Sequence, residues 1–125
     1  MGENKKIGKV GEDFAVNYLI ENKYNILNRN FNSRIGEIDI IARKDDVICF
    51  IEVKSRRNLN CGTPAESVTN TKQQHIRRTA EYYIMKEGYK IPRFKSTIFR
   101  FDVCNIILNA GGKTLESMEY IENAF

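Results

Sequence analysis

The sequence predicts an α/β domain in which helices flank a central sheet. Two strongly apolar, strand-like runs in the first half are joined by a short polar turn, and segments with helical periodicity precede and follow them. At 125 residues the chain has the length of one domain, residues 1–125. Its 42% hydrophobic and 29% charged content is ordinary for a globular protein.

The first expected element is a helix over residues 5–22. Apolar side chains recur there at helical spacing and predict the stripe that faces the sheet. They are Ile7, Val10, Phe14, Ala15, Tyr18 and Leu19. Glu12 lies at the edge of this stripe, so its carboxylate either leans over the rim of the sheet or is an ordinary flanking charge.

Three strands are expected next, over residues 24–31, 34–43 and 47–55. The first is polar, which is typical of an edge strand. The third is apolar at nearly every position from 47 to 53, which predicts a central strand covered on both faces.

The second half contains a loop over residues 56–70, a helix over 71–87, a strand within 94–108 and, after a turn at 109–112, a last strand over 113–121. The inward stripe of this second helix consists of Ile76, Ala80, Tyr83 and Ile84.

Charged residues inside the two apolar runs are the feature that most needs a physical explanation. If the turn is centred on residues 44–47, antiparallel pairing sets Asp39 opposite Glu52 and Glu37 opposite Lys54. A buried carboxylate persists only with an opposite charge, a hydrogen-bond network or a metal ion. The register therefore predicts a compact ionisable cluster on one face of the sheet.

Two interpretations of this cluster follow from the residues. In one, Asp39 and Glu52 hold Mg²⁺ or Mn²⁺, because hard divalent ions prefer oxygen ligands and relieve the repulsion between two carboxylates. In the other, the cluster is a buried ion network in which Glu37 pairs with Lys54 and Asp39 pairs with an arginine.

The positive charge is concentrated in the middle of the chain. Residues 1–52, 53–100 and 101–125 carry net charges of −1, +8 and −3. Such a concentration favours a polyanionic partner, although a solvated lysine-rich face has the same composition. The candidates for contact with nucleic acid are Arg56, Arg57, Lys72, Gln73 and Arg77. The Gln73 amide has an alternative role, which is to satisfy backbone groups in the first helical turn.

The other features exclude several classes of protein. Three scattered cysteines indicate reduced thiols, and a single histidine without a Cys-x-x-Cys pair argues against structural zinc. No apolar stretch approaches the ~20 residues that span a bilayer, and no secretory signal is expected, so we expect no membrane partner and a cytoplasmic location. Asp102, between apolar residues, is either a third acidic contributor or the partner of an arginine.

Three spaced blocks resemble the PD-(D/E)XK nuclease superfamily and, more narrowly, the YraN-like family of small bacterial proteins. They are Gly-Glu-Asp-Phe-Ala at 11–15, Gly-Glu-Ile-Asp-Ile-Ile-Ala at 36–42 and Phe-Ile-Glu-Val-Lys-Ser-Arg at 50–56. The C-terminal Arg100-Phe101-Asp102-Val103 and Asn123-Ala124-Phe125 fit the same family. Ile38 stands where the superfamily name places proline, a residue without a role in the mechanism.

The resemblance implies a restriction-endonuclease-like domain with a central mixed sheet in the order αβββαββ, similar to archaeal Holliday junction resolvases. It implies that Asp39, Glu52 and the Val53 carbonyl hold Mg²⁺ or Mn²⁺, that Lys54 is the catalytic lysine and that Glu12 is an additional acidic residue that reaches the metal site. We therefore expect phosphodiester hydrolysis in nucleic acid, in DNA rather than RNA, with branched or junction DNA as candidates.

A symmetric junction as substrate would require a homodimer. Two alternatives stay open: a nucleic-acid-binding or adaptor protein that keeps this fold without turnover, and a metal-independent hydrolase that uses the carboxylate pair as acid and base.

Overall fold

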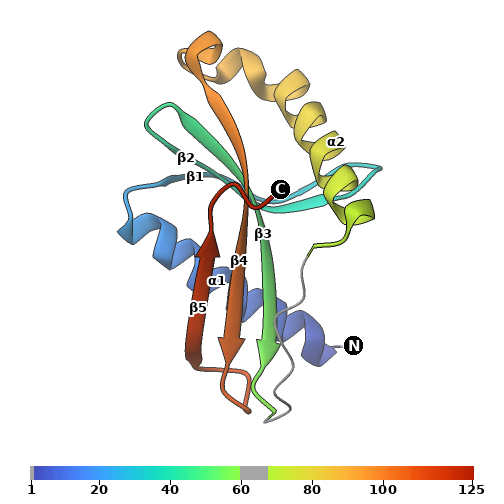
Figure 1. Ribbon diagram of the computed structural model, residues 1–125, viewed down its shortest axis with the longest axis vertical. Coiled ribbons are helices and arrows are strands. Elements are labelled where there is room, and N and C mark those ends of the chain that lie inside the picture. The colour runs from blue at the N-terminus through green and yellow to red at the C-terminus, as the bar shows by residue number, and fades with distance from the viewer. Residues whose placement is uncertain (1, 60–67) are drawn as a thin grey trace.

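A computed structural model describes residues 2–59 and 68–125 (Figure 1). Its elements are α1 (Gly2–Glu21), β1 (Asn25–Asn32), β2 (Glu37–Lys44), β3 (Val47–Arg57), α2 (Asn70–Glu87), β4 (Ile98–Leu108) and β5 (Leu115–Ile121), with short 3₁₀ turns at Gly88–Lys90 and Phe94–Ser96. The expected mixed α/β domain is therefore confirmed.

The sheet has five strands in the order β1-β2-β3-β4-β5. β3 and β4 run parallel, whereas every other neighbouring pair is antiparallel. A parallel pair needs a crossover connection, and α2 lies in that connection. The central place of β3 and the edge position of β1 are both as predicted from the apolar sequence of β3 and the polar sequence of β1.

The two helices cover opposite faces of the sheet and create two apolar cores. Ala15 and Leu19 of α1 are fully buried in the core that includes Ile51. Ile76 of α2 belongs to the second core, around Phe50. Figure 1 shows α1 crossing behind β3, β4 and β5, and α2 lying beside the upper part of the sheet.

All six residues of the stripe expected on α1 lie in or pack against one apolar core, but they are not equally buried. Ile7 and Tyr18 are only partly buried, and the centre of the contact is the row of Gly11, Ala15 and Leu19. At Gly11 the helix approaches β3 so closely that a Cβ atom would overlap Ser55 Oγ and lie 2.8 Å from Ser55 Cβ. The close approach at a glycine moves the buried face toward this row.

Several predicted boundaries also need correction. β3 continues to Arg57, so the first two residues of the expected loop are strand, and β4 begins at Ile98 because residues 94–96 form a 3₁₀ turn. β5 begins at Leu115 rather than at residue 113. The part of the expected loop at residues 60–67, with Cys61, lies outside the described residues.

Two of the three cysteines lie within the described part of the chain. Cys49 and Cys104 are free and buried, as the reduced-thiol prediction requires. Burial raises the pKa of both thiols to about 12, so neither is a thiolate at neutral pH. In the same described ranges, neither helix combines the length and apolar character needed to cross a bilayer.

Candidate functional site

The acidic pair lies at the point where β2 and β3 stop pairing. The ladder between these strands has the predicted register and ends with Ile40 opposite Ile51. The next pair in that register is Asp39 with Glu52. Beyond the ladder the Val53 N–H donates to Asp39 Oδ2 at 2.8 Å. A side-chain oxygen thus takes the place of a strand carbonyl, and the carboxylate is fixed beside β3.

Because β2 and β3 separate, one of the predicted cross-strand pairs does not form. Glu37 was expected opposite Lys54, but it pairs with Asn32 of β1, and the β2–β3 ladder does not reach it. In Figure 1 the β1–β2 hairpin bends toward α2 while β3 continues in another direction. The Glu37–Lys54 part of the ion-network interpretation is therefore not supported by the strand pairing.

Asp39 and Glu52 lie close enough for each carboxyl group to affect the charge of the other. Glu52 is 7% exposed and Asp39 is mostly buried. Burial, followed by the charge of Glu52, raises the pKa of Asp39 to about 8, although the bond from Val53 N–H lowers it. A hydrogen bond between the two carboxyl groups favours the protonated form of Asp39. The pair therefore holds a proton at neutral pH in the absence of another cation.

Glu12 approaches the pair from the opposite face. Its side chain is 17% exposed and lies 3.8 Å from Arg29 of β1. Burial raises the pKa of Glu12, and a hydrogen bond with Asn30 opposes that shift. Glu12 also contributes to the raised pKa of Asp39 through its charge. The residues on β1 that hold Glu12 were missed in the sequence, because a polar edge strand gives no signal for such contacts.

Lys54 follows Glu52 on β3 by two residues, so its side chain points to the same face of the sheet. It is half-buried, and its neighbour on β4 is Asn105. Asn105 Oδ1 is buried and has no hydrogen-bond partner within residues 2–59 and 68–125, whereas Asn105 Nδ2 donates to Glu119 at 3.4 Å. This face of β3 thus presents a carboxylate and an ammonium in succession, next to the buried amide oxygen of Asn105.

The first turn of α2 brings a second lysine to the pair. Lys72 Nζ lies 3.5 Å from Glu52 Oε2, and the Lys72 side chain is 46% exposed. Thr69 caps the helix by accepting from the Lys72 N–H at 3.2 Å. Gln73 does not face the site: its Nε2 donates to the Val68 carbonyl at 3.0 Å, which is the backbone role considered as its alternative.

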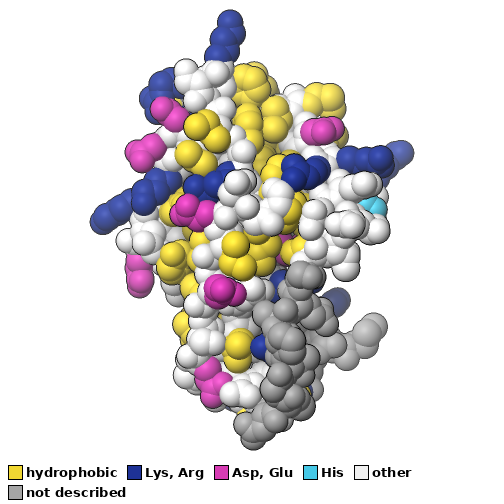
Figure 2. All heavy atoms as spheres, in the orientation of Figure 1, with side chains coloured by type: hydrophobic (Ala, Val, Ile, Leu, Met, Phe, Trp, Pro, Cys, Tyr) yellow, Lys and Arg dark blue, Asp and Glu magenta, His cyan; other side chains and the backbone are white. Residues whose placement is uncertain are grey.

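The other three candidates for nucleic-acid contact have the following contacts in the structure. Arg57 ends β3 and donates to the Ala110 carbonyl at 3.4 Å. The guanidinium of Arg77 stacks 4.7 Å from the centre of the Phe101 ring. Arg56 follows Lys54 on β3 by two residues and so lies on the same face of the sheet, and its buried Nε has no hydrogen-bond partner among the described residues. Figure 2 shows Lys and Arg side chains projecting around α2.

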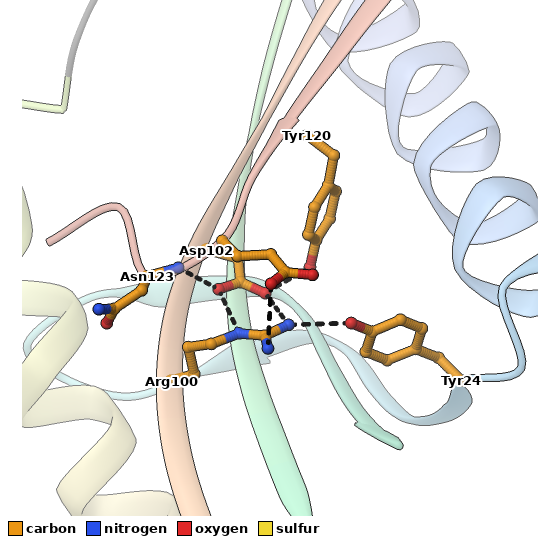
Figure 3. Close-up of polar contacts among 6 residues, drawn as sticks. Tyr24, Arg100, Asp102, Tyr120 and Asn123 are labelled. Atoms are coloured by element: carbon orange, nitrogen blue, oxygen red, sulfur yellow. Dashed lines mark hydrogen bonds and ion pairs between the residues drawn. The ribbon is translucent and has the colours of Figure 1, made fainter. Parts of the chain in front are cut away.

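Asp102 is not a third acidic contributor to the pair. It is fully buried and binds Arg100 through two hydrogen bonds of 2.9 Å. Tyr120 Oη donates to it at 2.6 Å and the Asn123 N–H at 2.9 Å, while Arg100 also donates to Tyr24 Oη (Figure 3). The arginine pairing considered in the sequence is confirmed, and the network joins β4 and β5 to the start of β1.

The chemistry of the acidic pair fits a divalent ion. Within residues 2–59 and 68–125 no three His, Cys, Asp or Glu side chains come close enough together to hold a metal. Mg²⁺ is commonly held by only one or two protein carboxylates together with water and phosphate. Asp39 and Glu52 supply two such carboxylates, and a divalent ion would relieve the burial and the repulsion that raise the pKa of Asp39.

Similar proteins agree with the family expected from the sequence. The chain matches the family described as "Uncharacterised protein family UPF0102" over residues 11–106. It is 51% identical over 122 residues to a UPF0102 protein of Dictyoglomus thermophilum, covering 98% of each chain. A UPF0102 protein of Clostridium tetani is 54% identical over 106 residues, which cover 85% of this chain and 83% of that protein. The chain therefore belongs to the UPF0102 family, the YraN-like family that its sequence blocks resemble.

Proposed function

We propose that this protein is a nuclease that uses Mg²⁺ or Mn²⁺ to hydrolyse phosphodiester bonds in DNA. The observation that carries the proposal is the buried Asp39–Glu52 pair at the place where β2 and β3 separate, with Asp39 held by the Val53 N–H and its pKa raised by burial and by Glu52. A carboxylate pair kept in an apolar setting weakens the fold unless a ligand uses it.

The residues of the site have distinct roles in this proposal. Asp39, Glu52 and the Val53 carbonyl would hold the ion, and Glu12 would add negative charge from the other face. The bound ion would polarise the scissile phosphate and lower the pKa of the attacking water. The Lys54 ammonium would orient that water or stabilise the extra negative charge on the phosphate oxygens.

The proposal extends to fold family, substrate and location. The order of helices and strands, with the acidic pair on β2 and β3, supports membership of the PD-(D/E)XK superfamily and a restriction-endonuclease-like domain. The +8 charge of residues 53–100 supports a nucleic-acid partner. The proposed location is the cytoplasm. Branched or junction DNA is the proposed substrate class, and a homodimer follows if the junction is cut symmetrically.

The test is a cleavage assay on defined substrates. Purified protein is incubated with junction, flapped, duplex and single-stranded DNA and with RNA, in Mg²⁺, Mn²⁺ or EDTA. We expect cleavage of at least one DNA substrate with a divalent ion and none in EDTA. No cleavage of any substrate in either metal would contradict nuclease activity, and equal cleavage in EDTA would contradict its dependence on metal.

A second candidate is a protein of the same fold that binds nucleic acid without turnover. The observation in its favour is the ion pair between Lys72 and Glu52, which supplies a positive charge to the pair without a metal. Binding of DNA in EDTA, combined with no cutting in Mg²⁺ or Mn²⁺, would favour this candidate.

A further inference from the structure

Lys72 occupies the position of a weakly held cation at the acidic pair. Its ammonium lies 3.5 Å from Glu52 Oε2, which is an ion-pair distance at the long end of hydrogen bonding. The two groups differ in exposure, with 8% of the Glu52 side chain and 46% of the Lys72 side chain accessible to solvent. The carboxylate is therefore fixed in the fold while the ammonium is free to leave toward solvent.

The backbone below Lys72 is held firmly, so its side chain is the part that can move. The Lys72 N–H donates to Thr69 Oγ1 at 3.2 Å, and the next residue, Gln73, donates from its backbone to the Thr69 carbonyl at 2.8 Å and from its side chain to Val68 at 3.0 Å. A lysine side chain has four rotatable bonds beyond this anchor. Its ammonium can thus exchange partners without any change in α2.

We propose that Lys72 alternates between two partners, Glu52 in the metal-free protein and a nucleic-acid phosphate once a divalent ion is bound. This inference rests on the proposed function, because it assigns a partner to the same site. A divalent ion at Asp39 and Glu52 repels the nearby ammonium and takes over the carboxylate oxygens that held it. The released ammonium then meets the phosphate that the ion also attracts, so metal and phosphate bind cooperatively.

The exchange predicts that removing the positive charge of a side chain beside the metal site strengthens metal binding. Lys72→Gln removes a competing cation, so it strengthens Mn²⁺ binding, by roughly threefold or more for one like charge at this distance. Lys72→Arg keeps the charge and binds Mn²⁺ within about twofold of the wild type. Lys86→Gln is the matched control, because Lys86 lies in the last turn of the same helix, about 21 Å away along its axis. That distance exceeds the screening length in ~0.1 M salt, so this variant should match the wild type.

The first measurement is calorimetric titration of Mn²⁺ alone into the wild type and the three variants. Tighter binding by Lys72→Gln, with Lys86→Gln unchanged, supports the exchange. If the wild type binds Mn²⁺ and Lys72→Gln binds it equally or more weakly, the exchange is wrong and the proposed function stands. If neither the wild type nor Lys72→Gln binds Mn²⁺, the exchange and the proposed function are both wrong.

The second measurement tests whether Lys72 binds a nucleic-acid phosphate once the divalent ion is present. Binding of a DNA duplex is measured against salt concentration in a Lys54→Ala background, which is expected to prevent cleavage. With Mn²⁺ present, adding Lys72→Gln should make the negative slope of log K against log salt shallower by about 0.9, the value for one phosphate contact. In EDTA the slope should not change. An equal loss of slope in both conditions would show that Lys72 binds phosphate regardless of metal and would overturn the exchange.

Discussion

Replacing Asp39 with asparagine should stabilise the metal-free protein, by an amount that grows with pH. Burial and the adjacent Glu52 raise the pKa of Asp39 to about 8, against an ordinary value of 3.8. The folded protein therefore takes up a proton that the unfolded chain lacks between these two pH values. Stability from this group is complete at low pH and is lost as pH rises toward 8.

The size of the effect follows from proton linkage. One proton taken up on folding changes the free energy of unfolding by about 1.4 kcal/mol per pH unit. Asparagine has no proton to gain or lose, and its Oδ1 can still accept from the Val53 N–H. Between pH 5 and pH 7 the advantage of Asp39→Asn over the wild type should therefore increase by about 3 kcal/mol.

The assay is urea denaturation of both proteins in EDTA at pH 5 and pH 7. Titrating groups that do not interact with Asp39 are common to the two proteins and cancel in the difference between them. Asp45→Asn is the matched control: Asp45 is exposed in the β2–β3 turn with φ 54°, a conformation that asparagine also accepts. The control should show no such increase. An advantage of Asp39→Asn that is equal at both pH values would refute the account of the pair.

Three further predictions concern the site and its support. Glu52→Ala and Lys54→Ala should each abolish Mg²⁺-dependent cleavage while keeping the wild-type circular dichroism spectrum; full activity in either purified variant would contradict its role. Gly11→Ala should lower the free energy of unfolding by about 1–3 kcal/mol through overlap with Ser55, and Ser55→Gly should restore part of that loss; an unchanged urea midpoint would show that α1 does not approach β3 so closely. Asp102→Asn should cost about 3–5 kcal/mol, because it leaves the mostly buried guanidinium of Arg100 with only the exposed Glu122, at 3.6 Å, as an anion; a loss under about 1 kcal/mol in urea would contradict the structural role of this network.

The acidic pair could be predicted because a hairpin has a simple register. Once the turn is centred on residues 44–47, every pair follows, and the ladder down to Ile40 and Ile51 obeys it. The end of the ladder could not be predicted in this way. β2 stays with β1 while β3 continues beside β4, a choice that depends on contacts between segments far apart in sequence. The Val53–Asp39 bond follows from that separation.

Helical periodicity predicted the inward stripe of both helices but not how closely α1 approaches the sheet. On α2, Ile76, Ala80 and Tyr83 are buried and Ile84 packs against the same core, as predicted. On α1 the contact is centred on a glycine, and a hydropathy pattern does not reveal how closely a helix approaches a strand. Likewise, the position of Lys72 beside Glu52 depends on the path of the chain between β3 and α2, which local patterns do not determine.

Calorimetric titration of Mn²⁺ into the purified protein tests the central claim most directly. We expect a saturable heat of binding in the wild type that disappears in Glu52→Ala and persists in Glu21→Ala, a matched substitution at an exposed position of α1. Absence of binding in the wild type, or equal binding by Glu52→Ala, would contradict the claim that the buried carboxylates of β2 and β3 exist to hold a divalent ion.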